Sequence, residues 1–305
     1  MSGTRRSVVL AERPQGLPTA NSFRIEEDAV PAPGPGEVLV RVLFLSIDPY
    51  MRGRMAGTQS YAKPVAIGGV MEGETVGVVE ASGDPRFAPG DCVVGARGWQ
   101  THTVWPAAGL VRVDPAAAPL PAWLGVLGMP GVTAYSAMTD IGQPREGETV
   151  VVSAASGPVG SVAGQLAKRA GARVIGIAGG AKKCAVVRDE FGFDDCLDHR
   201  GGDLAGALRA ACPDGIDVYV ENVGGAVQRA VFPLMRDFGR IVMIGMVAEY
   251  NDPDPAPGPS LMTVVRKRLR IQGLIVSDKP GRFGDWRALA APWVKDGSLR
   301  YREDV

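Results

Sequence analysis

The feature that most constrains the fold is a regular alternation of short apolar segments with helix-period segments, which begins near Gly131. The apolar segments are, in chain order, TVVVSA, RVIGIA, DCLD, IDVYVE, GRIVMIG and RIQGLIV. Strands that are separated by helices favour parallel pairing, because each parallel connection needs a crossover. The sequence therefore predicts an α/β domain built on a doubly wound parallel sheet of the Rossmann type.

The first third of the chain has a different pattern. Its apolar runs are broken by turn segments such as PAPGPGE and FAPGDC, and no helix-period segment separates them. The runs begin at Val38, Glu74, Asp91, Thr101 and Leu110. Short strands joined by such turns predict a mostly antiparallel β domain.

Composition limits the partners. The chain has 33 Lys and Arg against 33 Asp and Glu, so it offers no positive surplus for nucleic acid. No apolar stretch approaches the length of a membrane span or a signal-peptide core, so we expect no membrane partner. Its 4 cysteines and 2 histidines show neither disulfide-scaffold density nor zinc-ligand spacing. We therefore expect a metal-free protein of the reducing cytoplasm.

A glycine-containing turn joins the first apolar segment of the second part to a helix, over Val150–Lys168. Gly157 and Gly160 occupy the second and third glycine positions of a dinucleotide fingerprint, and Ala155 replaces the first. Pro158 suits the first helical position, and the open N–H groups of the helix start suit a pyrophosphate. This context favours a dinucleotide site over a simple connection.

The next segment indicates which dinucleotide is bound. NAD sites usually carry an acid roughly 20 residues beyond the glycines. Here the stretch Ile177–Cys184 contains no acid, and Lys182 and Lys183 follow two glycines. Because a lysine attracts a 2′-phosphate that an acid would repel, the sequence favours NADP(H) over NAD(H).

Six motifs together resemble those of the zinc-free medium-chain dehydrogenase/reductases. They are LSIDPYMRGRM, GMPGVTAY, AASGPVGSVAGQLAK, AGGAKKC, ENVGG and GMVAEYN. The resemblance covers essentially the whole chain and points to the NADPH-dependent curcumin, 2-alkenal and prostaglandin (leukotriene B4 dehydrogenase) reductases. It implies a GroES-like β-barrel catalytic domain over residues 1–127, completed by 280–305, and a Rossmann NADP-binding domain over 128–279. It also implies that a family tail is missing after Val305.

The resemblance further implies the cofactor-binding residues. The pyrophosphate loop would be Gly157, Pro158, Val159 and Gly160, and Lys183 would bind the 2′-phosphate. His199 falls where relatives carry Tyr or His beside the adenosine phosphate, while a plain surface histidine is an equally open interpretation. The nicotinamide half would be lined by Asn222, Ile244, Gly245, Met246, Leu274, Ile275 and Val276.

The reaction that the resemblance implies is hydride transfer from NADPH to the carbon-carbon double bond of an enone or enal. Charge then develops on the carbonyl oxygen, which calls for a neutral hydrogen-bond donor such as tyrosine. Tyr250 is the first candidate for a catalytic role and Tyr61 the second, and Tyr50 is expected to shape the substrate pocket.

Two alternatives stay open, a quinone oxidoreductase of the same superfamily and a non-catalytic NADPH-binding scaffold or sensor. Relatives are commonly dimers, so a homodimer is expected.

Overall fold

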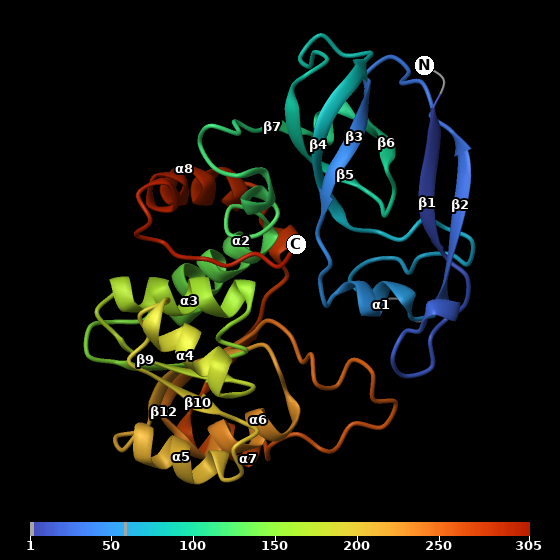
Figure 1. The fold of residues 1–305 in the computed structure, drawn as a ribbon. Coiled ribbons are helices and arrows are strands. Elements are labelled where there is room, and N and C mark those ends of the chain that lie inside the picture. Colours follow the sequence, from blue (N-terminus) through green and yellow to red (C-terminus); the bar gives the residue numbers. More distant parts are fainter. Residues whose placement is uncertain (1–2, 58–59) are drawn as a thin grey trace. The chain divides into compact units, whose positions relative to one another are not determined.

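A parallel sheet is the centre of residues 125–305 (Figure 1). The computed structural model describes residues 3–57 and 60–305, and its chain divides into unit 1, which ends at Leu124, and unit 2, which begins at Gly125. In unit 2 the strand order is β10-β9-β8-β11-β12-β13, all parallel. This is the Rossmann order, and it confirms the predicted doubly wound sheet.

The strands of unit 2 follow the predicted apolar segments closely. They are β8 (Thr149–Ser153), β9 (Arg173–Ala178), β10 (Asp195–Asp198), β11 (Ile216–Glu221), β12 (Met235–Met243) and β13 (Arg270–Gly273). The helices are α2 (Met129–Ser136), α3 (Pro158–Arg169), α4 (Ala181–Asp189), α5 (Leu204–Ala211), α6 (Gly225–Val231), α7 (Met262–Lys267) and α8 (Arg282–Lys295). The last strand is shorter than its apolar run, because Val276–Asp278 turn into a 3-10 helix.

Helices on both faces explain why the central strand β8 is apolar at consecutive positions rather than at alternate ones. In β8, Val150, Val151 and Val152 are all fully buried. Figure 1 shows α3 and α4 on one side of the sheet and α5 and α6 on the other. One face packs its core against Leu208 of α5 and Val231 of α6.

The C-terminal segment packs within unit 2. Trp286 of α8 is fully buried and donates from Nε1 to the carbonyl of Val126 at 2.7 Å. Gln165 of α3 donates from Nε2 to the carbonyl of Arg300 at 2.8 Å. Residues 280–305, which the resemblance assigns to the completion of the β domain, therefore include segments that contact α2 and α3 of unit 2.

Unit 1 is built of antiparallel strands, as predicted. A sheet of order β6-β3-β4-β5-β7 contains β3 (Glu37–Leu45), β4 (Glu74–Ser82), β5 (Cys92–Arg97), β6 (His102–Pro106) and β7 (Val111–Arg112). A separate hairpin joins β1 (Thr4–Leu10) to β2 (Phe23–Ala29), and α1 (Met51–Met55) is a short helix after β3. The sequence analysis did not predict β1, β2 or α1.

Candidate cofactor and substrate site

The predicted cofactor-binding residues of unit 2 all follow the carboxyl ends of the parallel strands. Gly157 follows β8, Lys183 follows β9 and His199 follows β10. Asn222 follows β11, Ile244 to Met246 follow β12 and Leu274 to Val276 follow β13. Ligands of open parallel sheets bind at this edge, where the strand order reverses between β8 and β11. The fold thus places the whole set at the edge that suits a dinucleotide.

The turn after β8 shows how the altered glycine loop is accommodated. Ala154 carries the left-handed backbone, with a φ of 49°. A Cβ on Gly160 would overlap the carbonyl oxygen of Ala154 and lie 3.0 Å from Cα of Ala155. The methyl of Ala155 itself fits because β9 has Gly176 opposite, where a Cβ would come within 2.8 Å of that methyl. The helix therefore starts close against the sheet despite the missing first glycine.

Gly157 and Pro158 occupy the start of α3 as expected. Gly157 is the N-cap residue and Pro158 is the first helical residue. The first helical hydrogen bond is donated by the N–H of Ser161 to the carbonyl of Gly157, at 2.9 Å. The N–H groups of Val159 and Gly160 thus precede the helical ladder, as at every helix start.

The ends of β9 and β10 bring basic side chains to one place. The carboxylate of Asp198 accepts hydrogen bonds from the N–H of Gly180 at 2.8 Å and of Arg200 at 2.9 Å. These bonds hold the pKa of Asp198 below its usual range. A Cβ on Gly179 would lie 2.9 Å from Nε2 of His199 and 3.1 Å from Nε of Arg200. Both side chains therefore lie over the turn that leads to Lys183.

The cations at this turn are Lys182, Lys183 and Arg200. In the described part of the chain, neither Lys182, Lys183 nor Arg200 forms an ion pair, and all three are exposed. At Gly180 a Cβ would meet no described atom within 4 Å, and a cluster of cations without ion pairs beside such open space suits a phosphate group.

A buried carboxylate ties β8 to β11. Glu221 is fully buried, and its Oε1 accepts from the N–H of Val223 at 2.7 Å, from the N–H of Gly224 at 3.1 Å and from Oγ of Ser153 at 3.0 Å. Asn222 donates from Nδ2 to the carbonyl of Ser153 at 2.9 Å, and its own N–H bonds Oγ of Ser153 at 2.8 Å. The side chain of Asn222 is therefore fixed at the switch point of the sheet.

The segment after β12 folds back on itself. Tyr250 is 37% exposed, and its hydroxyl oxygen accepts a long hydrogen bond from the N–H of Met246, at 3.4 Å. A Cβ on Gly245 would come within 2.9 Å of this oxygen, so a side chain at position 245 would crowd the hydroxyl of Tyr250. Glu249 accepts from the N–H of Gly225 at 2.8 Å, which anchors the segment to the start of α6.

The residues after β12 and β13 lie side by side. The N–H of Leu274 donates to the carbonyl of Met243 at 3.0 Å, and the N–H of Ile244 donates to the carbonyl of Glu221 at 2.9 Å. Ile244 and Leu274 both pack against the small core of Ile141 and Val242. Ile275 and Val276 are half-buried in the same region.

Unit 1 brings both of its candidate tyrosines to one arginine. The guanidinium of Arg54 lies 5.3 Å from the ring centroid of Tyr50 and 4.9 Å from that of Tyr61. Burial, together with the charge of Asp48, raises the pKa of Tyr50 to about 12. Tyr50 is therefore a neutral hydrogen-bond donor throughout the physiological range.

Sequence reasoning did not single out three of these groups, namely Arg54, Arg200 and Glu221. Arg200 directly follows His199, so its position after the third strand was an available signal. Neither Glu221 nor Arg54 had a comparable signal, because a charged residue gives no sign in the sequence that it is buried.

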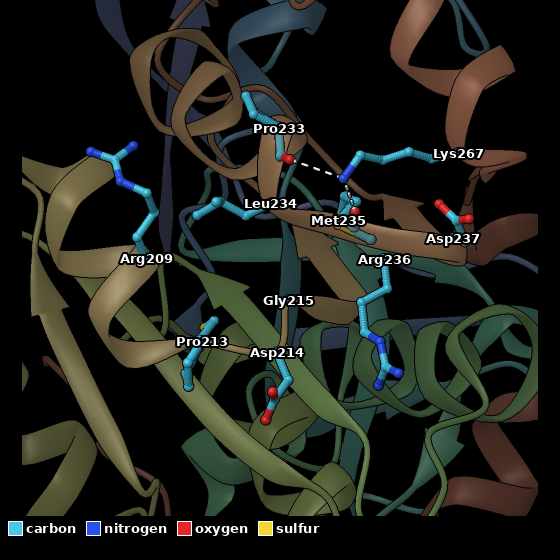
Figure 2. Close-up of a pocket in the computed structure, with 11 residues that line it drawn as sticks. Arg209, Pro213, Asp214, Gly215, Pro233, Leu234, Met235, Arg236, Asp237 and Lys267 are labelled. Atoms are coloured by element: carbon cyan, nitrogen blue, oxygen red, sulfur yellow. Dashed lines mark hydrogen bonds between the residues drawn. The ribbon is translucent and has the colours of Figure 1, made fainter.

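A cavity of about 610 Å³ lies in unit 2 near the amino ends of β11 and β12, opposite to the carboxyl ends that the predicted cofactor residues follow. Its walls come from the residues just before β11 and at the start of β12, together with α7. Figure 2 shows the ammonium of Lys267 directed at the carbonyls of Pro233 and Met235, to which it donates hydrogen bonds. The amino ends of the strands are remote from the switch point at the carboxyl ends, so we do not place the cofactor in this cavity.

Across residues 3–57 and 60–305, no three His, Cys, Asp or Glu side chains gather where they could hold a metal ion. Within the same ranges, no helix is both long and apolar enough to cross a bilayer.

Comparison with known proteins defines the class to which this fold and site belong. Residues 6–113 match a family described as the N-terminal domain of oxidoreductase, and residues 158–296 match one described as zinc-binding dehydrogenase. The chain is 48% identical to the NADPH-dependent curcumin reductase of Escherichia coli, over 98% of this chain and 89% of that protein. It is 37% identical to the NADP-dependent 2-alkenal reductase of Nicotiana tabacum, over 99% of this chain and 90% of the other.

A solved structure agrees with these relatives. The crystal structure of CurA in complex with NADPH from Vibrio vulnificus superposes with a TM-score of 0.92, at 44% identity, over 98% of this chain and 90% of that one. The chain therefore belongs to the medium-chain dehydrogenase/reductase family. Within it, the relatives are those of the zinc-free branch that includes curcumin, 2-alkenal and prostaglandin reductases.

Proposed function

We propose that this protein is a zinc-independent, NADPH-dependent reductase of the carbon-carbon double bond in α,β-unsaturated ketones and aldehydes. The observation that carries the proposal is the set of unpaired cations Lys183 and Arg200 beside Gly179 and Gly180, at the end of β9. Relatives with related activities cover nearly the whole chain, which supports the substrate class.

The residues present fit NADPH. The open start of α3 suits the pyrophosphate, and the close approach of Gly160 to Ala154 leaves no side chain in the way. Lys183 and Arg200 would bind the 2′-phosphate, with His199 beside them. Asn222, Ile244 to Met246 and Leu274 to Val276 would line the nicotinamide half.

NADPH, when bound, supplies the hydride that reduces the β-carbon of the substrate. The protein must then stabilise the negative charge that develops on the carbonyl oxygen and supply a proton at the α-carbon. Tyrosine hydroxyls are suited to this task, because they are neutral at physiological pH and still donate hydrogen bonds.

We assign this donor role first to Tyr250. Among the described residues, the one hydrogen bond to its hydroxyl is the long bond from Met246, so the hydroxyl is available to a substrate oxygen. In unit 1, Tyr61 is the second candidate, and Tyr50 shapes the pocket wall.

The experiment that tests the proposal is NADPH oxidation by the purified protein against a panel of enones, enals and quinones. Reduction of enones and enals with formation of the saturated carbonyl product supports it. Turnover confined to quinones supports the quinone oxidoreductase, and tight NADPH binding without turnover on any of the three supports a scaffold or sensor. NADH should be a much poorer donor than NADPH.

We further propose that the protein forms a homodimer through the outer edge of unit 2. The edge strand β13 presents unpaired backbone groups on its outer side. The neighbouring α7 buries no residue, and Leu261, Met262 and Val265 are exposed there, with Val265 at 69%. Light scattering after gel filtration should report a dimer, and Val265→Glu should shift it towards the monomer. Leu17→Glu in unit 1 is the control, and a monomeric wild type would refute the dimer.

The state of the four cysteines is relevant to the cellular location of the protein. All are free thiols, and Cys184, Cys196 and Cys212 are buried. Free thiols are typical of the reducing cytoplasm, which we propose as its location.

A further inference from the structure

Arg54 is an unusually buried cation. Its side chain lies in α1 of unit 1, and the residue is only 9% exposed. Tyr50 precedes it by four residues, the spacing that brings two side chains together on a helix. Both Tyr50 and Tyr61 place their rings within about 6 Å of the guanidinium, the range in which a cation is attracted to an aromatic face. One cation thus contacts both candidate tyrosines of this unit.

The position of Arg54 is fixed from two directions. Its Nε lies 3.1 Å from Oε2 of Glu72, an ion pair that holds the guanidinium by charge. This Nε makes no hydrogen bond in the described part of the chain. The backbone carbonyl of Arg54 also accepts a hydrogen bond from the N–H of Val65, at 2.8 Å.

A second arginine ties together the two ends of the segment that carries Tyr61. The guanidinium of Arg13 donates to the carbonyls of Met55 at 3.0 Å and Ala56 at 2.8 Å, which lie before the segment. It also donates to the carbonyl of Val65 at 3.2 Å, which lies after it. The backbone on both sides of Tyr61 is therefore anchored to the same group.

The side chain of Tyr61 has little else to hold it. Tyr61 is 56% exposed, and it makes no hydrogen bond to the described residues. Its contact with Arg54 is then the interaction that selects one ring orientation among those open to an exposed tyrosine.

We propose that Arg54 is a positioning residue for the reduction, which holds the ring of Tyr61 so that its hydroxyl meets the substrate carbonyl. This inference rests on the proposed function, in which Tyr61 is the second candidate for a hydrogen-bond donor to the substrate carbonyl. Misplacing a reacting group by about 1 Å costs about a hundredfold in rate. The loss of the contact between Arg54 and the ring of Tyr61 should therefore lower turnover measurably.

The test is a double-mutant cycle in the full-length protein, with an enone as substrate. Arg54→Met removes the cation and keeps most of the length, and Tyr61→Leu removes the ring. Each single variant is expected to lower kcat/KM by roughly ten- to a hundredfold, while the Kd for NADPH stays unchanged. The double variant should be no slower than Tyr61→Leu alone. Arg54→Lys keeps the charge and should restore part of the loss.

Controls separate positioning from folding. Arg41→Met, which removes an exposed ion pair between Arg41 of β3 and Glu80 of β4, should leave kcat/KM unchanged. If Arg54→Met does not fold, the cycle is run with Arg54→Lys, whose partial loss should vanish in the Tyr61→Leu background. Losses that multiply in the double variant overturn the inference and leave the proposed function intact. No loss of turnover in Tyr61→Leu removes Tyr61 from the proposed mechanism and the inference with it.

Discussion

The carboxylate of Asp198, at the end of β10, accepts a hydrogen bond from the backbone N–H of Gly180 at 2.8 Å, where α4 begins. The same carboxylate accepts from the N–H of Arg200, so one acid orders two segments that carry cations. The acid forms no ion pair with Lys183 or Arg200 among the described residues, and its pKa is lowered first by these backbone bonds and also by the charge of Arg200. This arrangement leads directly to a prediction about cofactor choice.

Lys183→Ala and Arg200→Ala should each weaken NADPH far more than NADH. A hydrogen bond to a charged group contributes about 1.5–3 kcal/mol, which corresponds to roughly a ten- to hundredfold rise in Kd. Titration of protein fluorescence with each cofactor measures the effect. Lys295→Ala, an exposed cation of α8, is the control. Equal losses for NADPH and NADH would remove the 2′-phosphate assignment.

Two glycines of the loop after β8 should behave differently. A Cβ on Gly160 overlaps the carbonyl oxygen of Ala154, so Gly160→Ala should destabilise the fold by about 1–3 kcal/mol. A Cβ on Gly157 meets only that oxygen, at 3.2 Å. Gly157→Ala should therefore keep the melting temperature but weaken NADPH, since the methyl would face the pyrophosphate. The reverse pattern in thermal melts and cofactor titrations would contradict the geometry.

Glu221→Leu should lower the free energy of unfolding by about 2–6 kcal/mol, because the N–H groups of Val223 and Gly224 lose their acceptor at about 1–3 kcal/mol each. Glu221→Gln keeps an acceptor oxygen and should cost less. Urea unfolding measures both variants. If the Leu variant were as stable as the Gln variant, the carboxylate would have no part in holding this turn.

Tyr250→Phe should lower turnover on a small enone by about 10²–10³, the usual effect of removing one donor to a developing oxyanion. Within the described part of the chain the hydroxyl makes a single long bond, so folding and NADPH binding should change little. Steady-state kinetics with an NADPH titration test this, and Tyr301→Phe serves as the matched control. Unchanged turnover would exclude Tyr250 from the reaction.

Asp194 should contribute to the acid sensitivity of the fold. Burial raises its pKa, but hydrogen bonds from Lys168 at 2.8 Å and from the N–H of Val174 at 2.7 Å outweigh this and lower it. A lowered pKa stabilises the fold above the unfolded value of about 3.9 and loses that contribution as pH falls through the folded value. Asp194→Asn should therefore be less stable than wild type at neutral pH, and the gap should close in acid. Urea unfolding over a pH series measures this difference in the free energy of unfolding, with Asp189→Asn as the control. A difference between wild type and Asp194→Asn that stays constant with pH would contradict the expectation.

Much of unit 2 could be predicted from sequence, for a physical reason. Its central strands are buried on both faces and helices such as α3 on one, so apolar runs and helical periods alternate clearly. The hairpin of β1 and β2 could not be predicted in this way. FRIEEDA of β2 is exposed at nearly every position, so burial leaves no alternating pattern in its sequence.

The site was predictable only in part. Lys183 and Asn222 lie in motifs that are continuous along the chain. Glu221 meets Ser153, which is 68 residues away, and this contact exists only after β8 and β11 pair. Arg54 is similar, since its burial depends on the segments that Arg13 and Glu72 bring around it.

The pair of Ala155 and Gly176 has a consequence for how such proteins are searched for. The space between them holds one methyl group, which Ala155 supplies here because Gly176 has no side chain. A glycine fingerprint that is read along a single loop therefore records only part of a steric condition that involves two segments of the chain. Searches that score the loop and the neighbouring strand jointly should recover nucleotide-binding folds that a linear pattern rejects.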